Sequence, residues 1–294
     1  MRLHVLRSPT GGGRESRRAS DQLLGELAAA GHEIIDVTGG SSDETSENLQ
    51  HLIDGGEVDR VLVCGGDGLV HLAVQHLALS GVPMALCPSG SGNDFATALG
   101  IHTPDVATTV ASARPIDLIK VTTPNGFVSW VASIAIAGFP ASINERANKI
   151  RLPIGSQIYT LAAALELPRF GRLPLSLRLD GHQIETDSAM LAIGNTKLFG
   201  GGMVACPDAT AVDGLVHLTS IQHVGRLGIL RHLARRGGGT ADRPEVLRRT
   251  ARRIDVDTPG IAMWADGEPL GEAPLSFEVI SEALLVPGLA SPAS

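Results

Sequence analysis

The stretch Arg60-Val61-Leu62-Val63-Cys64-Gly65-Gly66-Asp67-Gly68 decides the fold of this chain. Its first half is a short, continuous apolar run, which predicts a strand buried on both faces. Three glycines and one aspartate end the run, and apolar residues at helical spacing follow over residues 69–77. Glycines let a backbone approach a phosphate, and the amides at the start of a helix attract its charge. The stretch therefore predicts a strand, a phosphate-binding turn and a helix.

A second unit of the same kind follows. Residues 84–87 predict another short buried strand, and the next glycine-rich loop reads Ser89-Gly90-Ser91-Gly92-Asn93-Asp94. Asn93 or Asp94 can begin a helix that runs to Leu99. Two such loops at neighbouring strand ends indicate one polyanionic ligand that lies across both.

Neither loop fits two common nucleotide motifs. The chain has no Gly-x-x-x-x-Gly-Lys-Ser/Thr sequence of the Walker A type. A dinucleotide fingerprint needs a third glycine, but that position holds His71 after the first loop and Phe95 after the second. Gly-Gly-Asp-Gly alone is compatible with NAD kinases, phosphofructokinases and lipid kinases.

Strands alternate with helices over the first 113 residues. Residues 3–6 and 33–37 predict two more strands, while residues 15–30 predict a helix that Gly31 ends. Another helix starts at residues 41–47. This alternation predicts an open parallel sheet with ligands at the carboxyl ends of its strands.

The pattern changes after Pro115, where short apolar segments separated by turn residues predict an antiparallel β-sandwich. The predicted strands are residues 117–123, 127–136, 175–179, 189–193, 215–220, 253–256, 261–265 and 275–280. Helical stretches at residues 142–147, 156–167 and 224–236 interrupt them. We predict an α/β domain over residues 1–115 and a mostly β domain over residues 116–282.

Composition narrows the class of protein. A formal net charge of −7 argues against a general attraction to nucleic acid or anionic lipid. The cysteines, Cys64, Cys87 and Cys206, lack Cys-x-x-Cys spacing, which favours a reduced cytoplasmic protein without a structural zinc. We see no signal peptide, and the longest apolar run, residues 130–140, is shorter than the ~20 residues of a membrane span. Any membrane contact is expected to be peripheral.

The two loops together, with Phe95-Ala96 after the second, resemble the catalytic domain shared by diacylglycerol kinases, sphingosine kinases and soluble bacterial lipid kinases. The resemblance continues in order along nearly the whole chain, through Ala137-Gly138-Phe139, Glu145-Arg146-Ala147-Asn148, Gly200-Gly201-Gly202-Met203, Pro207-Asp208-Ala209, Asp213-Gly214-Leu215 and Asp266-Gly267-Glu268. It implies an N-terminal domain of the NAD kinase and phosphofructokinase type, which residues 283–294 rejoin, and a β-sandwich that binds lipid.

The resemblance also implies an activity and its site. The activity is ATP- and magnesium-dependent phosphorylation of a lipid hydroxyl, with diacylglycerol converted to phosphatidic acid as the first choice. Asp266 would activate the hydroxyl, Glu268 would support magnesium, and Asp67 would act near that metal. Nucleotide contacts are implied at Ser8, Thr38, Gly65, Gly66, Asp67, Gly68, Gly90, Ser91, Gly92, Asn93 and Glu268. A structural magnesium is implied at Asp213 and the backbone carbonyls of Thr210 and Leu215.

Each of these residues also has an ordinary structural interpretation. Asp67, Asn93 and Asp94 can be helix caps, and Asp266-Gly267 and Asp213-Gly214 can be plain turns. A carboxylate beside a polyphosphate implies a metal between them, because the bare charges would repel.

Two departures from the family pattern leave alternatives open. Ser8 stands where relatives have asparagine, and Leu72 stands where they have glutamate. The chain could therefore be a nucleotide- or lipid-binding protein with little catalysis. Leu69 and His71 resemble sphingosine kinases, which keeps a sphingoid base open as the acceptor. A small-molecule kinase of the NAD kinase type would leave the second loop and Asp266-Gly267-Glu268 unexplained.

Residues 224–236 predict an amphipathic helix with apolar residues on one face and arginines on the other. It can cover the sandwich core or touch an anionic bilayer, and further arginines follow at Arg243, Arg248, Arg249, Arg252 and Arg253. We expect a lipid substrate, peripheral contact with the inner membrane face and no nucleic-acid partner. The oligomeric state is open, a homodimer included.

Overall fold

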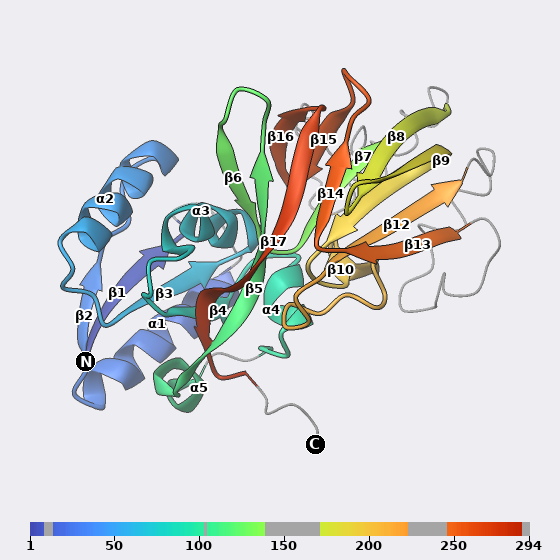
Figure 1. Cartoon of the computed structure of the whole chain (residues 1–294). Coiled ribbons are helices and arrows are strands. Elements are labelled where there is room, and N and C mark those ends of the chain that lie inside the picture. The colour runs from blue at the N-terminus through green and yellow to red at the C-terminus, as the bar shows by residue number, and fades with distance from the viewer. Residues whose placement is uncertain (9–13, 103–104, 139–170, 223–245, 290–294) are drawn as a thin grey trace. The chain divides into compact units, whose positions relative to one another are not determined.

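The computed structural model describes residues 1–8, 14–102, 105–138, 171–222 and 246–289. The chain divides into two compact units (Figure 1). Unit 1 comprises Met1–Leu118 and Ile280–Ser294, and unit 2 comprises Ile119–Val279. The chain leaves unit 1 within strand β5 (Ala113–Thr122) and returns to it within strand β17 (Leu275–Pro287). The domain boundaries predicted near residues 115 and 283 stay predictions.

Unit 1 contains a four-stranded sheet in the order β2-β1-β3-β4, and all three pairings are parallel. Its strands are β1 (Arg2–Arg7), β2 (Glu33–Asp36), β3 (Arg60–Gly65) and β4 (Met84–Pro88). Its helices are α1 (Arg14–Ala29), α2 (Ser42–Asp54), α3 (Asp67–Leu77), α4 (Asp94–Ala98) and α5 (Val106–Val110). The predicted open parallel sheet is confirmed.

The core of this sheet follows from the apolar runs. Every residue of β3 is buried, as expected for a strand with both faces covered. Leu23 and Leu27 of α1 pack against Leu3 of β1 and Leu62 of β3. Helix ends match simple capping chemistry: Ser41 accepts a hydrogen bond from the amide of Glu44 at the start of α2, and Gly31 after α1 has φ +84°.

Unit 2 is an antiparallel, β-sandwich-like array, which confirms the predicted class. Its remaining strands are β6 (Val128–Val131), β7 (Ile134–Gly138), β8 (Leu173–Leu179), β9 (His182–Gly194), β10 (Leu198–Phe199), β11 (Met203–Val204), β12 (Val216–Gln222), β13 (Val246–Ala251), β14 (Arg253–Val256), β15 (Ala262–Ala265) and β16 (Glu268–Glu272). The main sheet runs β16-β15-β7-β9-β8-β14-β17-β5-β6, and β12 and β13 join it at β9.

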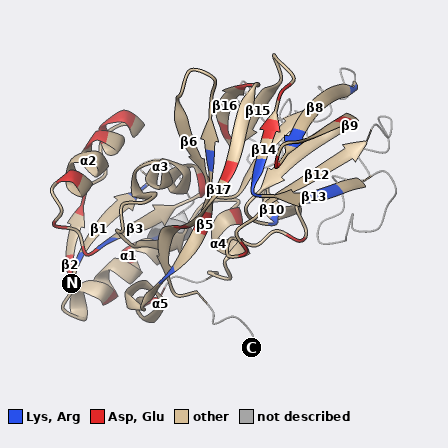
Figure 2. Cartoon of the chain, in the orientation of Figure 1, with Lys and Arg blue, Asp and Glu red and all other residues tan. Residues whose placement is uncertain are grey.

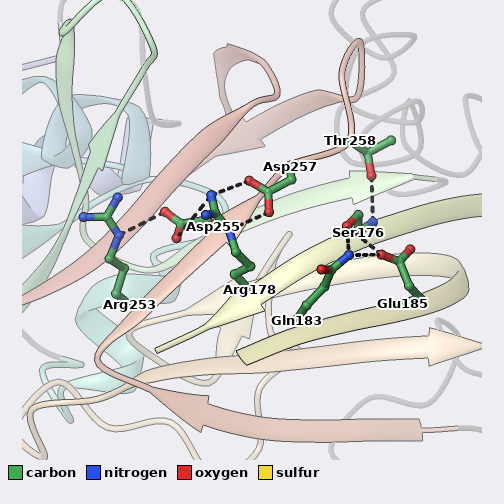
Figure 3. A network of polar contacts seen from close by, with 8 residues as sticks. All are labelled: Ser176, Arg178, Gln183, Glu185, Arg253, Asp255, Asp257 and Thr258. Carbon is green, nitrogen blue, oxygen red and sulfur yellow. Dashed lines mark hydrogen bonds and ion pairs between the residues drawn. The ribbon is translucent and has the colours of Figure 1, made fainter. Parts of the chain in front are cut away.

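Side chains alternate between the core and the outer face of this sheet. Leu175, Leu177 and Leu179 of β8 are buried, whereas Arg178 between them points outward. Figure 3 shows how the outer side chains pair with one another. Arg178 makes two 2.8 Å hydrogen bonds to Asp257, and the hydroxyl of Ser176 donates to Glu185 at 2.7 Å. This outer face is polar and internally paired.

The strands predicted from the sequence need correction in two respects. The single strand predicted for residues 127–136 is two strands, β6 and β7, separated at Ala132 and Ser133. The prediction lacks strands β10, β11, β13 and β16, because strands of two residues, an arginine-rich segment and a short Pro-Gly segment show no clear alternation. The helical stretches predicted at residues 142–147, 156–167 and 224–236 lie outside the described residues. None of the described helices is long and apolar enough to span a membrane.

Candidate active site

The predicted nucleotide contacts of unit 1 follow the ends of its four parallel strands and lie along one edge of the sheet. The sheet order places Thr38 after β2, Ser8 after β1, the first glycine loop after β3 and the second after β4. Hydrogen bonds join these ends: the amide of Arg7 donates to the Thr38 hydroxyl at 2.8 Å, and the amide of Ser8 donates to the Cys64 carbonyl at 3.2 Å. The carboxyl edge therefore gathers residues that are distant in sequence, where ligands of open α/β sheets bind.

The two glycine loops contact each other directly. Gly65 pairs with Pro88 at the end of the β3–β4 ladder, and the amide of Ser89 donates to the Gly65 carbonyl at 3.0 Å. A Cβ atom on Gly90 would lie 2.4 Å from the Cα of Gly66, and one on Gly66 would lie 3.0 Å from the Cα of Gly90. Only glycine permits this approach, because no side chain fits between the loops.

Asp67 ties the two loops together. It is the first residue of α3, and helix α3 has Gly66 as its N-cap, without a capping side chain. The Oδ1 atom of Asp67 instead accepts a hydrogen bond from the amide of Phe95, in the first turn of α4, at 3.2 Å. Asp67 therefore caps the helix of the other loop rather than its own. Asp67 is thus a helix cap, as one interpretation of the sequence proposed, but it caps α4 and not α3.

Asn93 shapes the second loop from within. Its backbone is left-handed (φ 55°, ψ 37°), and its side chain forms two hydrogen bonds to Gly90, accepting from the amide at 2.8 Å and donating to the carbonyl at 2.9 Å. Ser91, which is exposed, and Gly92 lie between these two residues. The Asn93 side chain is thus committed to holding the loop.

Leu72, one of the two departures from the family pattern, lies on α3 together with Leu69 and His71. A Cβ atom on Gly65 would lie 2.7 Å from the Cδ2 atom of Leu69, so the leucine covers this glycine. Leu72 is half-buried, and the carbonyl of His71 accepts a hydrogen bond from Gln75 at 3.2 Å. Leu69 and Leu72 thus supply apolar packing and no ligand for a cation.

Beneath the loops, Cys64 and Cys87 form a cross-strand pair in register. A hydrogen bond between the thiols raises the pKa of Cys64 and lowers the pKa of Cys87 to about 7. Burial raises both values, and Arg7 lowers both. Because each residue is at most 3% exposed, the sulfur atoms support the sheet and do not face a ligand.

In unit 2, Asp266 occupies the turn between β15 and β16 with φ +52°. Its Oδ2 atom accepts the amide of Ala132 at 2.8 Å, and its Oδ1 atom accepts the amides of Ser133 at 2.8 Å and Ile134 at 3.3 Å. Three successive amides thus bind one carboxylate at the break between β6 and β7. This side chain explains why the apolar run at residues 127–136 is divided.

Asn195, which sequence reasoning missed, holds the same break from the other side. Its buried side chain donates to the Ala132 carbonyl at 2.9 Å, and the amides of Asn195 and Thr196 donate to the Ser133 carbonyl at 2.8 Å and 3.2 Å. The available signal was a polar Gly-Asn-Thr sequence after the long apolar strand β9. Together Asp266 and Asn195 fix residues 132–134.

Glu268 contrasts with Asp266, two residues earlier. It is exposed at the start of β16, opposite Ala265. Within the described part of the chain its carboxylate has no hydrogen-bond or ion-pair partner. The turn therefore presents one carboxylate that is occupied by backbone amides and one that is available.

The predicted structural metal site lies on the segment between β11 and β12. The Oδ1 atom of Asp213 accepts the amide of Leu215 at 3.1 Å, and the Oδ2 atom lies 2.9 Å from the Nε2 atom of His217. Among the described residues, no group of three or more His, Cys, Asp or Glu side chains could hold a metal. A magnesium here would therefore use Asp213 together with backbone carbonyls, such as those of Thr210 and Leu215, and water. Such hard oxygen donors fit the ion.

Comparisons with known proteins decide the family. The family model of the diacylglycerol kinase catalytic domain matches residues 2–121, and that of the YegS C-terminal NAD kinase beta sandwich-like domain matches residues 133–287. A diacylglycerol kinase of Mycobacterium tuberculosis is 32% identical over 292 residues, which cover 97% of this chain and 94% of that protein. The chain belongs to the diacylglycerol kinase family.

The fold of this family is also found among solved structures. A structure described as a diacylglycerol kinase from Bacillus anthracis matches with a TM-score of 0.72, covers 99% of this chain and 97% of that one, and is 18% identical. This structural likeness concerns the fold alone. The family models and the mycobacterial relative confirm the predicted family resemblance and the lipid kinase class. The site residues, taken one by one, stay predictions.

Proposed function

We propose that this diacylglycerol kinase family member transfers the γ-phosphate of ATP to a lipid hydroxyl. Diacylglycerol is the first-choice acceptor, and phosphatidic acid is its product. The observation that carries the proposal is the contact between the two glycine loops at Gly66 and Gly90. It brings two sets of backbone amides together, and such amides can surround a polyphosphate.

The residues of unit 1 would bind and orient the nucleotide. Gly65–Gly68 and the loop at Gly90, Ser91 and Gly92 would face the phosphates, with Ser8 and Thr38 farther along the same sheet edge. Asp67, which already joins the loops through Phe95, is the candidate carboxylate on the nucleotide side. Magnesium, when bound with ATP, would neutralise charge that develops on the phosphates.

The geometry of unit 2 favours moving the role of general base from Asp266, to which the resemblance assigned it, to Glu268. The lone pairs of Asp266 are used by three amides, so we assign it to positioning residues 132–134. Glu268 is the candidate base. It would take the proton of the acceptor hydroxyl as that oxygen bonds to the γ-phosphorus and the bond to the β,γ-bridging oxygen breaks, which releases ADP.

The test is transfer of label from γ-labelled ATP with magnesium to a panel of acceptors: diacylglycerol, sphingosine, monoacylglycerol, phosphatidylglycerol and NAD. We expect labelled phosphatidic acid. Labelled sphingosine would keep the reaction and change the acceptor, in line with Leu69 and His71. Labelled NAD would contradict a lipid kinase, and tight ATP binding without any labelled lipid would favour a binding protein.

We further propose that Asp213 holds a structural magnesium with the carbonyls of Thr210 and Leu215. Magnesium should then raise the melting temperature of the wild type, because it would bind the native state only. Asp213→Asn should abolish this rise. Asp208→Asn is the control, because Asp208 is an exposed carboxylate paired with Arg248 on the same connecting segment. An equal magnesium effect in all three proteins would contradict the site.

A further inference from the structure

The β5–β6 hairpin exposes apolar side chains at its tip. Among the described residues, the exposed large hydrophobic side chains are Met1, Leu79, Phe127, Val128 and Val212. Phe127 is 64% exposed and Val128 is 39% exposed, and in this set only these two are neighbours in sequence. Removing an aromatic and a branched apolar side chain from water is favourable. Their joint exposure at one tip indicates a surface that they contact.

The turn holds Phe127 in a defined position. The amide of Thr123 donates to the Phe127 carbonyl at 3.0 Å, and the amide of Gly126 donates to the Thr123 carbonyl at 2.9 Å. The amide of Phe127 donates to the Asn125 side chain at 3.4 Å, and Gly126 supplies the required positive φ of 84°. The tip is therefore presented by a closed turn.

One face of the hairpin continues this apolar tip. Strand β6 is the last strand of the sheet, and its register with β5 places Val128 opposite Thr122 and Trp130 opposite Lys120. Because side chains alternate along a strand, these four share a face, whereas Val131 on the opposite face is buried. On this face Val128 thus lies next to the tip, and Trp130 lies beside Lys120 farther from it.

The charge of this segment differs from that of the whole chain. Residues 118–144 contain a single charged side chain, Lys120, in a protein of net charge −7. Lys120 has no acidic partner within the described part of the chain. Several arginines of unit 2, by contrast, have acidic partners: Arg178 pairs with Asp257, Arg253 with Asp255 and Arg248 with Asp208. In Figure 2 strand β6 carries no red, the colour of Asp and Glu, whereas Figure 3 shows the acidic side chains of Glu185, Asp255 and Asp257 elsewhere in unit 2.

We propose that the β5–β6 hairpin inserts its tip into the surface of an anionic bilayer. Phe127 and Val128 enter the acyl boundary, Trp130 lies at the level of the head groups, and Lys120 attracts the lipid phosphates. The proposal rests on the proposed function, because a lipid acceptor must be taken from a bilayer. It names a contact different from the arginine-rich region at residues 224–253 that the sequence suggested.

Binding is measured by flotation of the full chain with vesicles of phosphatidylglycerol and phosphatidylcholine in equal parts. We expect Phe127→Ser to weaken vesicle partitioning by about tenfold, as loss of one buried aromatic side chain predicts. Leu79→Ser is the matched control, because Leu79 is 63% exposed in unit 1. Lys120→Gln should reduce the preference for anionic over pure phosphatidylcholine vesicles. Equal partitioning of Phe127→Ser and the wild type would overturn the proposal.

Tryptophan fluorescence gives a second, independent readout. The chain has two tryptophans, and Trp264 is only 8% exposed. Brominated phosphatidylcholine in the anionic vesicles should therefore quench Trp130 alone, and Trp130→Phe should lose that quenching. If Trp130→Phe were quenched as strongly as the wild type, the proposed position of Trp130 in the bilayer would be wrong.

Kinase assays separate this proposal from the proposed function. Phe127→Ser should phosphorylate a dispersed short-chain diacylglycerol as well as the wild type does, and should lose about tenfold in kcat/KM on diacylglycerol in vesicles. If the wild type phosphorylated none of the acceptors, the proposed function would be contradicted. The flotation experiment would still show whether the hairpin binds the bilayer. Equal loss on both forms of diacylglycerol would contradict a membrane role.

Discussion

The glycine loops of unit 1 and the Asp266 turn of unit 2 position their groups by opposite means. The loops meet at Gly66 and Gly90 because side chains are missing there. The turn is fixed because one charged side chain, Asp266, binds the amide of Ala132, 134 residues away in sequence. The first arrangement should be broken by adding atoms, and the second by removing charge.

Gly90→Ala should have the largest effect. Its methyl group would lie 2.4 Å from the Cα of Gly66 and must separate the loops. We expect a loss of about 3 kcal/mol in the free energy of unfolding, since overpacking a tight contact typically costs ~1–3 kcal/mol. ATP affinity should fall by at least about tenfold, equivalent to ~1.4 kcal/mol, and calorimetric titration and urea unfolding measure the two effects.

The control for this variant is Gly25→Ala. Gly25 lies in α1, where an added Cβ atom would meet no other atom within 4 Å, and alanine is the better helix former by ~1 kcal/mol. The control should keep ATP affinity and leave stability equal or higher. If Gly90→Ala bound ATP as tightly as the wild type, the claim that the loops depend on missing side chains would be contradicted.

Asp266→Asn should have the next largest effect, on unit 2. An amide can accept hydrogen bonds through one oxygen only, and its nitrogen would face a backbone N–H donor. We expect a loss of about 2 kcal/mol in the free energy of unfolding, because hydrogen bonds to charged groups contribute ~1.5–3 kcal/mol. ATP affinity should be unchanged. Urea unfolding that matches the wild type would show that the turn does not depend on this charge.

Asp67→Asn should have a smaller effect on stability and a selective effect on the nucleotide. The asparagine oxygen can still accept the amide of Phe95, so the loss should be ~1 kcal/mol or less. The missing charge should weaken binding of magnesium-ATP more than binding of ATP without magnesium. Titrations with and without the metal measure this difference, and equal weakening of both would contradict a role near magnesium.

Acidification should have the smallest effect, and it concerns unit 1. Burial lowers the pKa of His4, and the nearby positive charge of Arg2 lowers it further. Burial also lowers the pKa of His76. The unfolded chain then binds these protons more readily, so stability should fall as the pH drops below about 6.5. Urea midpoints at about pH 7.5 and about pH 5.5 should differ less in His4→Gln than in the wild type. An equal difference in both proteins would exclude His4 as a source.

The two regions also differ in how far their sequences predict them. The parallel sheet and both glycine loops follow from local runs, so unit 1 was predicted in outline. The bond from Asp67 to Phe95 was not, because a turn aspartate ordinarily caps its own helix. In unit 2 the apolar run at residues 127–136 looks like one strand, and the contacts that divide it come from Asp266 and Asn195, both far along the chain. Long-range side-chain contacts of this kind leave no local signal.

The carboxylates of Asp266 and Glu268 provide the most direct test of the account. Phosphate transfer to diacylglycerol should be measured for Glu268→Gln, together with its ATP affinity and its urea midpoint. We predict a fall in kcat of ~100-fold or more, with affinity and midpoint unchanged, because a base acts in the transition state and Glu268 has no structural partner among the described residues. Transfer within about threefold of the wild-type rate, below the ~100-fold contribution of a general base, would contradict the assignment.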